Sequence, residues 1–223
     1  MRDFAEIYRI AAERKGGEAA LETMLARPMA TEQLAETKDD RWLSTMAKCL
    51  FQAGFNWKVI EAKWQGFEEA FDGFVPKRVA FYDGETVDRL LSDKRIVRNG
   101  AKIKAVVENA AFLVELADTH GSAARFFADW PDDDYVGLLA FLKKRGSRLG
   151  GVTGQRVLRS MGKDSFILSN DVTARLIAEG VVAKAPSSKR DMTAVQEAFN
   201  LWRKESGRSL TEISRVLAMS VGA

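Results

Sequence analysis

The chain has 223 residues and a net charge of +3, and 46% of its residues are hydrophobic. This composition is typical of a globular protein with a sizeable core, and no apolar run approaches the roughly 18 residues of a membrane span. One cysteine and one histidine exclude an intrachain disulfide, a four-cysteine iron–sulfur cluster and a self-contained zinc site. We therefore expect no metal and no cofactor. The opening MRDFAEIYRI lacks a signal-peptide core, so we expect a cytoplasmic protein without a membrane anchor.

The first half of the chain carries apolar residues at helical spacing. They recur at i, i+3, i+4 and i+7 in segments 4–11, 43–51 and 103–114, which predicts an amphipathic helix in each. Alternating patterns are scarce, and RVAFYDG at 78–84 is the nearest candidate for a strand. The pattern therefore indicates an all-α protein.

A helical hairpin is predicted at 142–162. Asp132–Asp134 precede the apolar run YVGLLAFL, as acidic residues do at a helix N-terminus, and Gly146 follows the last cations of that run as a helix stop. Residues 149–154, LGGVTG, then predict a tight turn, and a second helix begins with QRVLRSMG.

The C-terminal part is predicted to be a polar loop followed by a helical pair over 190–223. KAPSSKRD at 184–191 is the loop. Thr193 with Gln196, and Ser209 with Glu212, have the spacing of capping boxes at helix starts.

The hairpin is strongly cationic, because the sequence has no acidic residue between Tyr135 and Lys163. Backbone N–H groups of a glycine turn at a helix N-terminus can bind phosphate. Two interpretations stay open: a solvated basic loop between helices, or a grip on a nucleic-acid backbone. In the second, the candidate backbone contacts are Gly150, Gly151, Val152, Thr153, Gly154, Lys144, Arg148 and Arg156.

Three segments carry a resemblance to a known family. They read CLFQAGFNWKVIEAKWQGFEEAFDGFVPKRVA at 49–80, RIVRNGAKIKAVVENA at 95–110 and LKKRGSRLGG at 142–151. In this order they resemble the DNA-3-methyladenine glycosylase I family, a branch of the helix-hairpin-helix DNA glycosylases. The family's usual hairpin, L-P-G-V-G, differs from the turn in this chain, which lacks the proline.

The resemblance implies an all-α helix-hairpin-helix glycosylase fold, with two helical lobes and a cleft between them. We expect a single domain over 1–223. Within it, residues 1–38 form divergent N-terminal helices and residues 39–183 form the family-like core.

The resemblance also implies a DNA-repair enzyme. It is a monofunctional glycosylase that flips an alkylated purine such as 3-methyladenine out of double-stranded DNA and hydrolyses its N-glycosidic bond. The family's stacking tryptophan corresponds to Trp57, and Gln52 and Tyr8 are further candidates for the base pocket. Trp57 and Gln52 have core packing as their alternative. The family's pocket glutamate corresponds to Cys49, which is not a carboxylate, and the family's zinc ligands are absent.

Asp171 is the candidate catalytic acid, because related glycosylases carry an aspartate shortly after the hairpin. A carboxylate there can stabilise the sugar cation or activate water. The alternative is an N-cap for the helix VTARLIAEG. The region TGQRVL, where lyase-type relatives place a lysine, has none.

Two other functions remain compatible with the sequence. One is a non-catalytic DNA-binding module that kept the scaffold, which the change at Cys49 supports. The other is a protein-interaction domain whose basic runs are only solvated surface. We expect double-stranded DNA with an alkylated base as the partner, and a monomer.

Overall fold

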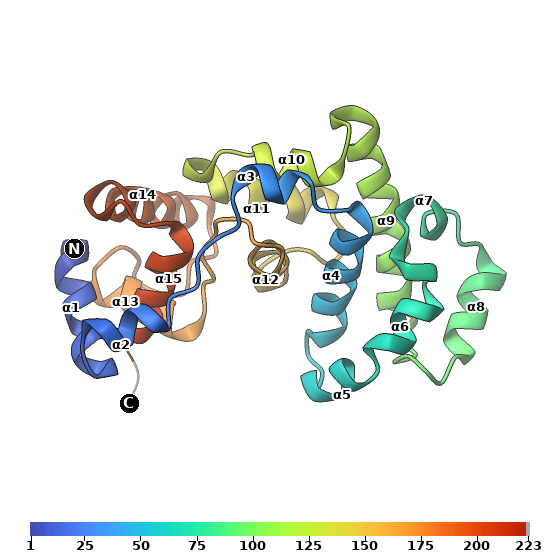
Figure 1. Ribbon diagram of the computed structural model, residues 1–223, viewed down its shortest axis with the longest axis horizontal. Helices are drawn as coiled ribbons and strands as arrows, with labels where there is room; N and C mark the ends of the chain where they lie inside the picture. Colours follow the sequence, from blue (N-terminus) through green and yellow to red (C-terminus); the bar gives the residue numbers. More distant parts are fainter. Residues whose placement is uncertain (222–223) are drawn as a thin grey trace. The chain divides into compact units, whose positions relative to one another are not determined.

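Every regular element of the computed structural model, which describes residues 1–221, is a helix (Figure 1). The all-α expectation is therefore confirmed. Contacts divide the chain into two compact units. Unit 1 combines residues 1–29, residues 131–138 and the chain from 162 onward, whereas unit 2 combines residues 30–130 and 139–161. The predicted single domain with two lobes and a cleft stays a prediction, and residues 222–223 of the predicted C-terminal pair lie outside the described residues.

Unit 2 is built on a long central helix, α9 (Gly100–His120), which packs against α4 (Asp39–Gln52), α7 (Pro76–Val79), α8 (Gly84–Ser92) and α10 (Ala123–Asp129). Its other helices are α3 (Thr31–Ala35), α5 (Trp57–Ala62), α6 (Trp64–Ala70), the 3-10 turn η1 (Asp72–Phe74) and α12 (Val152–Met161). The opposite face of α4 packs against α12, so α4 links the hairpin to the rest of this unit (Figure 1). The predicted helices at 43–51 and 103–114 are confirmed.

An aromatic cluster fixes the C-terminal half of α4. Phe51 packs edge-on against Phe67, with ring centres 4.6 Å apart, and Phe71 and Phe74 continue the stack. All four rings are fully buried. Because this cluster holds the C-terminal end of α4 in place, the loop that follows α4, residues 53–56, begins at a rigidly packed residue.

Unit 1 gathers the two ends of the described chain. It contains α1 (Phe4–Lys15), α2 (Glu18–Thr23), the 3-10 turn η2 (Asp132–Asp134), α13 (Asn170–Ala178), α14 (Lys189–Ser206) and α15 (Leu210–Met219). Helix α11 (Tyr135–Arg145) contributes its first residues to unit 1 and the rest to unit 2. The core of unit 1 is a buried aromatic stack of Tyr135, Phe166, Phe199 and Trp202.

The predicted capping box of Ser209 and Glu212 is confirmed, and both of its hydrogen bonds are formed at the start of α15. The box predicted at Thr193 and Gln196 is wrong. Helix α14 already begins at Lys189, where Ser188 and Asp191 form the capping box. The predicted loop 184–191 is consequently shorter, because its last residues form the first turn of α14.

The strand candidate at 78–84 is wrong as well. These residues close α7, make a turn and open α8, where Asp83 caps the helix by accepting a hydrogen bond from the backbone of Thr86. A lone extended segment has no partner for its backbone groups, whereas the cap satisfies one of them locally.

Candidate functional site

The hairpin forms, but its second helix starts earlier than expected. Helix α11 ends at Arg145, and the Gly146 N–H donates to the Leu142 carbonyl, so Gly146 stops the helix as predicted. Helix α12 begins at Val152, three residues before the predicted start at Gln155. Gly154 therefore lies in the first turn of α12, where it is buried. A Cβ at this position would lie 2.3 Å from the Leu149 carbonyl oxygen. The glycine is needed for close packing inside the hairpin.

A buried asparagine fixes the connection between the two helices. The Asn109 side chain, on α9, accepts from the Ser147 N–H at 2.8 Å and donates to the Ser147 carbonyl at 3.0 Å. Asn109 is fully buried. Directly after this clamp, Arg148 takes a left-handed backbone conformation with φ of 58°. Sequence reasoning missed Asn109, although an asparagine on the apolar face of a predicted helix is the signal that would have found it.

The turn itself faces outward. Gly151 is exposed with φ of 60°, a conformation that favours glycine, and nothing lies within 4 Å of where its Cβ would be. Lys144 and Arg148 are exposed, Thr153 and Gly150 are half-buried, and Val152 is exposed at the helix start. The backbone of the glycine turn is thus open to a ligand.

Trp57 is at the surface of the same unit. Asn56 caps α5 by accepting a hydrogen bond from the backbone of Lys58, which places Trp57 at the first position of that helix. The indole is 46% exposed, so the core-packing alternative is wrong for Trp57. The Arg156 guanidinium, from α12, lies over this indole, 4.6 Å from the ring centre. Trp57, predicted to stack on the base, and Arg156, predicted to contact the DNA backbone, are therefore in direct contact.

Phe55 is a second exposed aromatic residue in the loop before Trp57. Its ring is 45% exposed, and it follows Gly54, which has a φ of 69°. Sequence reasoning missed this residue. Its signal was a phenylalanine between glycine and asparagine, two residues that favour turns.

Cys49 and Gln52 lie on the last two turns of α4. Cys49 is buried, and burial raises the pKa of its thiol to about 11, although the nearby Arg156 charge and a hydrogen bond with Ser160 oppose the rise. The thiol is therefore neutral at physiological pH and is not a nucleophile. Gln52 is half-buried, and its backbone carbonyl accepts a hydrogen bond from the Phe55 N–H at 3.1 Å.

Lys102 closes the C-terminal end of α4. Its ammonium donates to the carbonyls of Phe51, at 3.2 Å, and Ala53, at 2.8 Å. Burial lowers the pKa of Lys102, and the charge of nearby Arg148 lowers it further. Two cations are thus close together beside the hairpin, and within residues 1–221 neither forms an ion pair with a carboxylate. Such a position favours an anionic ligand.

Tyr8 and Asp171 belong to unit 1. The Tyr8 hydroxyl donates to Glu22 at 2.6 Å, and burial followed by this bond raises the pKa of Tyr8 to about 12. Asp171 is exposed in the first turn of α13. The N-cap interpretation of Asp171 is wrong, because Ser169 is the cap and accepts from the Val172 N–H. The base-pocket role of Tyr8 and the catalytic role of Asp171 stay predictions.

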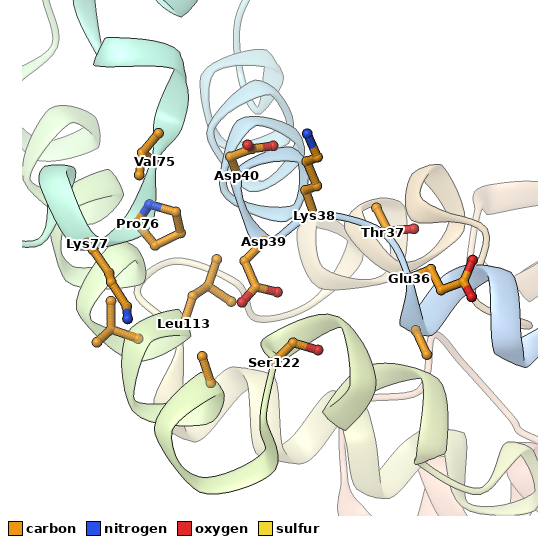
Figure 2. Close-up of a pocket in the computed structure, with 13 residues that line it drawn as sticks. Glu36, Thr37, Lys38, Asp39, Asp40, Val75, Pro76, Lys77, Leu113 and Ser122 are labelled. Carbon is orange, nitrogen blue, oxygen red and sulfur yellow. The ribbon is translucent and has the colours of Figure 1, made fainter.

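Unit 2 also has a pocket of about 450 Å³, and none of the predicted site residues lines it (Figure 2). It is lined by the segment 35–40, by 75–77 and by residues of α9 around Leu113. Asp39 points into it, yet both carboxylate oxygens accept hydrogen bonds from backbone N–H groups at the start of α10, those of Ala123 and Ala124. This aspartate is therefore a helix cap.

Across the described part of the chain, no cluster of histidine, cysteine, aspartate or glutamate has the arrangement of a metal site. Within residues 1–221, no helix is both long enough and apolar enough to span a lipid bilayer.

Comparison with known proteins shows which family the chain resembles. The model of the methyladenine glycosylase family matches residues 34–136. In this segment the chain is similar to the methyladenine glycosylase family. The match covers α4, Cys49, Gln52, Trp57 and most of the resemblance seen in the sequence, and it ends before the hairpin turn.

Two curated relatives match a shorter part of the chain. The DNA-3-methyladenine glycosylase 1 of Escherichia coli is 34% identical over 65 residues, which are 29% of this chain and 35% of the relative. The DNA-3-methyladenine glycosylase of Haemophilus influenzae is 34% identical over 59 residues, 26% of this chain and 32% of the relative. The chain thus matches about a third of the length of these relatives.

Solved structures extend the likeness in fold. The 3-methyladenine DNA glycosylase I of Staphylococcus aureus has a TM-score of 0.52 and 25% identity, over 62% of this chain and 80% of its own. A variant of the same glycosylase aligns at TM-score 0.52 and 23% identity over 74% of this chain and 89% of its own. The all-helical fold of methyladenine glycosylases is therefore present in this chain.

Proposed function

We propose that this protein is a monofunctional DNA glycosylase of the 3-methyladenine type, acting on alkylated purines in double-stranded DNA. One observation carries the proposal. In unit 2, whose residues 34–130 lie within the match to the methyladenine glycosylase family model, the half-exposed Trp57 indole contacts Arg156. Arg156 lies in the second turn of α12, directly after the open, cationic glycine turn. A ring that can stack on a base and a turn that can bind a phosphate are thereby held together.

The glycine turn and its cations are proposed to hold the strand. Like every α-helix, α12 begins with N–H groups that have no carbonyl one turn earlier, and these groups attract phosphate. Lys144, Arg148 and Arg156 supply positive charge around them. Phe55, exposed beside Trp57, is suited to fill the space that a flipped nucleotide leaves in the duplex.

The base is proposed to stack on Trp57, which contributes about 1–3 kcal/mol per base. A purine alkylated at N3 or N7 is cationic while it is attached to the sugar, so it leaves with the glycosidic electron pair as a neutral base. Water then adds to the sugar carbon and loses a proton. In this reaction a carboxylate such as Asp171 would stabilise the sugar cation or accept that proton. The chemistry needs neither a metal nor a lysine nucleophile. We further propose that the protein acts as a cytoplasmic monomer.

The test is release of free base from alkylated duplex DNA, with the products identified by chromatography. Trp57→Ala should slow release roughly 5- to 150-fold, the equivalent of the stacking energy. Phe81→Ala is the matched control, because Phe81 is an aromatic residue of unit 2 that is 84% exposed and belongs to a different turn. Equal rates for wild type and Trp57→Ala would contradict the proposal.

A non-catalytic DNA-binding module is the second candidate. The observation that favours it is Cys49, which places a buried neutral thiol where the family resemblance expects a glutamate. Such a module would bind the same duplex with a salt-dependent affinity and release no base. The base-release assay therefore separates the two candidates.

A further inference from the structure

The contact between Arg156 and Trp57 brings together two groups that the proposed function uses separately. The guanidinium lies over the indole face with a separation of 4.6 Å from the ring centre. No ion pair joins Arg156 to a carboxylate within residues 1–221, and Cys49, close enough for the Arg156 charge to act on it, offers only a neutral thiol. The indole is therefore the principal partner of this cation.

A guanidinium on the ring competes with a base for the same surface. Both are flat groups that stack on an aromatic face, and an alkylated purine shares the positive charge of arginine. While Arg156 stays in place, a base approaching this face meets an occupied surface and a like charge. The free protein thus keeps this face of its stacking ring covered.

A bound DNA strand offers Arg156 a better partner. Arg156 lies in the second turn of α12, whose N-terminus follows the open glycine turn at Gly151. A phosphate held at that turn can accept two parallel hydrogen bonds from a guanidinium, and such charge-assisted pairs are stronger than an exposed cation–π contact.

We propose that Arg156 covers Trp57 in the free protein and leaves it for a phosphate when DNA binds, so that the stacking face opens only on a bound strand. This inference rests on the proposed function, and it makes Arg156 a specificity-determining residue. Free nucleobases and nucleosides meet the covered ring, whereas a base attached to DNA meets the open one. Linkage makes the effect reciprocal: if bound duplex raises the affinity of the protein for a base by some factor, a bound base raises its affinity for the duplex by the same factor.

The test follows Trp57 by fluorine NMR of protein labelled with 5-fluorotryptophan. The chain has five tryptophans, and the spectrum of Trp57→Phe assigns the resonance that matters. An undamaged duplex should move the Trp57 resonance of the wild type. In Arg156→Ala the resonance should already be shifted without DNA, and the duplex should move it little. Arg156→Gln repeats the measurement with a side chain that retains polarity, in case truncation unfolds the protein.

Affinity for free 3-methyladenine gives a second readout. The duplex should raise it between about twofold and about thirtyfold in the wild type, the range that corresponds to a cation–π contact. Arg156→Ala should bind the free base more tightly without DNA, by a similar factor, and gain nothing from the duplex. Lys144→Ala is the matched control, since it removes a hairpin cation that does not touch the ring. It should weaken DNA binding and keep the Trp57 response.

Two results would overturn the inference. In one, the duplex binds and the Trp57 resonance stays in place. In the other, the duplex moves the resonance equally in wild type and Arg156→Ala, which would mean that DNA acts on the indole directly. A protein that shows the Arg156-dependent response but releases no alkylated base would leave the inference intact and refute the proposed glycosylase activity.

Discussion

Burial of Cys49 keeps its thiol protonated and also makes the stability of the fold depend on pH. Its thiol is packed on α4 against α12, and burial raises its pKa to about 11 from an ordinary value near 9. A raised pKa of an acidic group stabilises the fold below the unfolded-state pKa, and this contribution is lost as the pH rises through the folded-state value. Alkaline pH therefore favours unfolding in the window between about 9 and about 11.

Iodoacetamide labelling tests this state of Cys49. We expect the native protein to react slowly at neutral pH and to approach full reactivity only near pH 11, because the thiolate is the reacting species. The measurement is the labelling rate by mass spectrometry across this pH range. Protein unfolded in urea is the control and should react with a midpoint near 9. Fast labelling of the native protein at neutral pH would show an activated thiol and reopen a nucleophilic role.

Single-residue roles were the least predictable part of the sequence. Asp171 and Ser169 both precede the helix VTARLIAEG as good N-cap residues, and only the path of the backbone decides that Ser169 caps it. Thr193 has the right spacing to Gln196, yet Ser188 and Asp191 begin α14 earlier. Where two capping residues lie within one or two turns, spacing alone cannot choose between them.

At the scale of the element, the hairpin was recognised from cations and glycines, but its glycines have different tasks. Gly154 packs closely against the backbone of Leu149, whose carbonyl oxygen lies 2.3 Å from where a Cβ would be. Gly151 has open space and a φ of 60°. The sequence shows three similar glycines because it contains no information on what packs against each.

Substitutions at the two glycines should separate stability from DNA binding. Gly154→Ala should destabilise the protein by about 3 kcal/mol, since the new methyl group clashes with a fixed carbonyl. Gly151→Ala should cost about 1–2 kcal/mol from the left-handed backbone alone. Urea unfolding measures both.

Gly151→Asp adds the electrostatic part of the same test. It should match Gly151→Ala in stability and lower the affinity for duplex DNA at least tenfold at low salt, because it places a negative charge where a phosphate is proposed to bind. DNA binding by fluorescence anisotropy measures the effect. If Gly151→Asp and Gly151→Ala bind DNA equally, the glycine turn is not the phosphate site.

For the whole molecule, helical periodicity was enough for the fold class but not for the division into units. Segments 4–11, 43–51 and 103–114 became α1, α4 and α9, because an apolar stripe of that spacing can be buried only on a helix. No pattern in the sequence indicates that unit 1 combines the first 29 residues with the chain from 162 onward. That pairing combines the packing of α1 against α14 and α15 with long-range polar contacts, and neither leaves a periodic pattern that names the partner.

Glu179 is the centre of those contacts. It accepts from the Arg2 backbone N–H and from the Arg2 guanidinium, each at 2.8 Å, and from Arg175 at 3.1 Å. Its side chain is fully buried. Burial alone would raise the pKa of Glu179, but the hydrogen bonds from Arg2 and Arg175 outweigh it and lower the pKa below its ordinary value. The first residues of the chain are thereby fastened to α13 of unit 1.

Because the folded-state pKa of Glu179 is lowered, its stabilisation is present above the unfolded-state value near 4.5 and is lost as the pH falls below it. Glu179→Gln should cost about 3 kcal/mol or more at neutral pH, since it leaves the buried Arg175 without its carboxylate, and it should flatten the loss of stability toward acid. Urea unfolding at neutral and acid pH measures both effects.

Glu6→Gln is the matched control, because Glu6 pairs with the same Arg2 but is exposed, and it should change stability by less than about 0.5 kcal/mol. Equal losses in the two variants would show that the buried network does not hold the N-terminus in place.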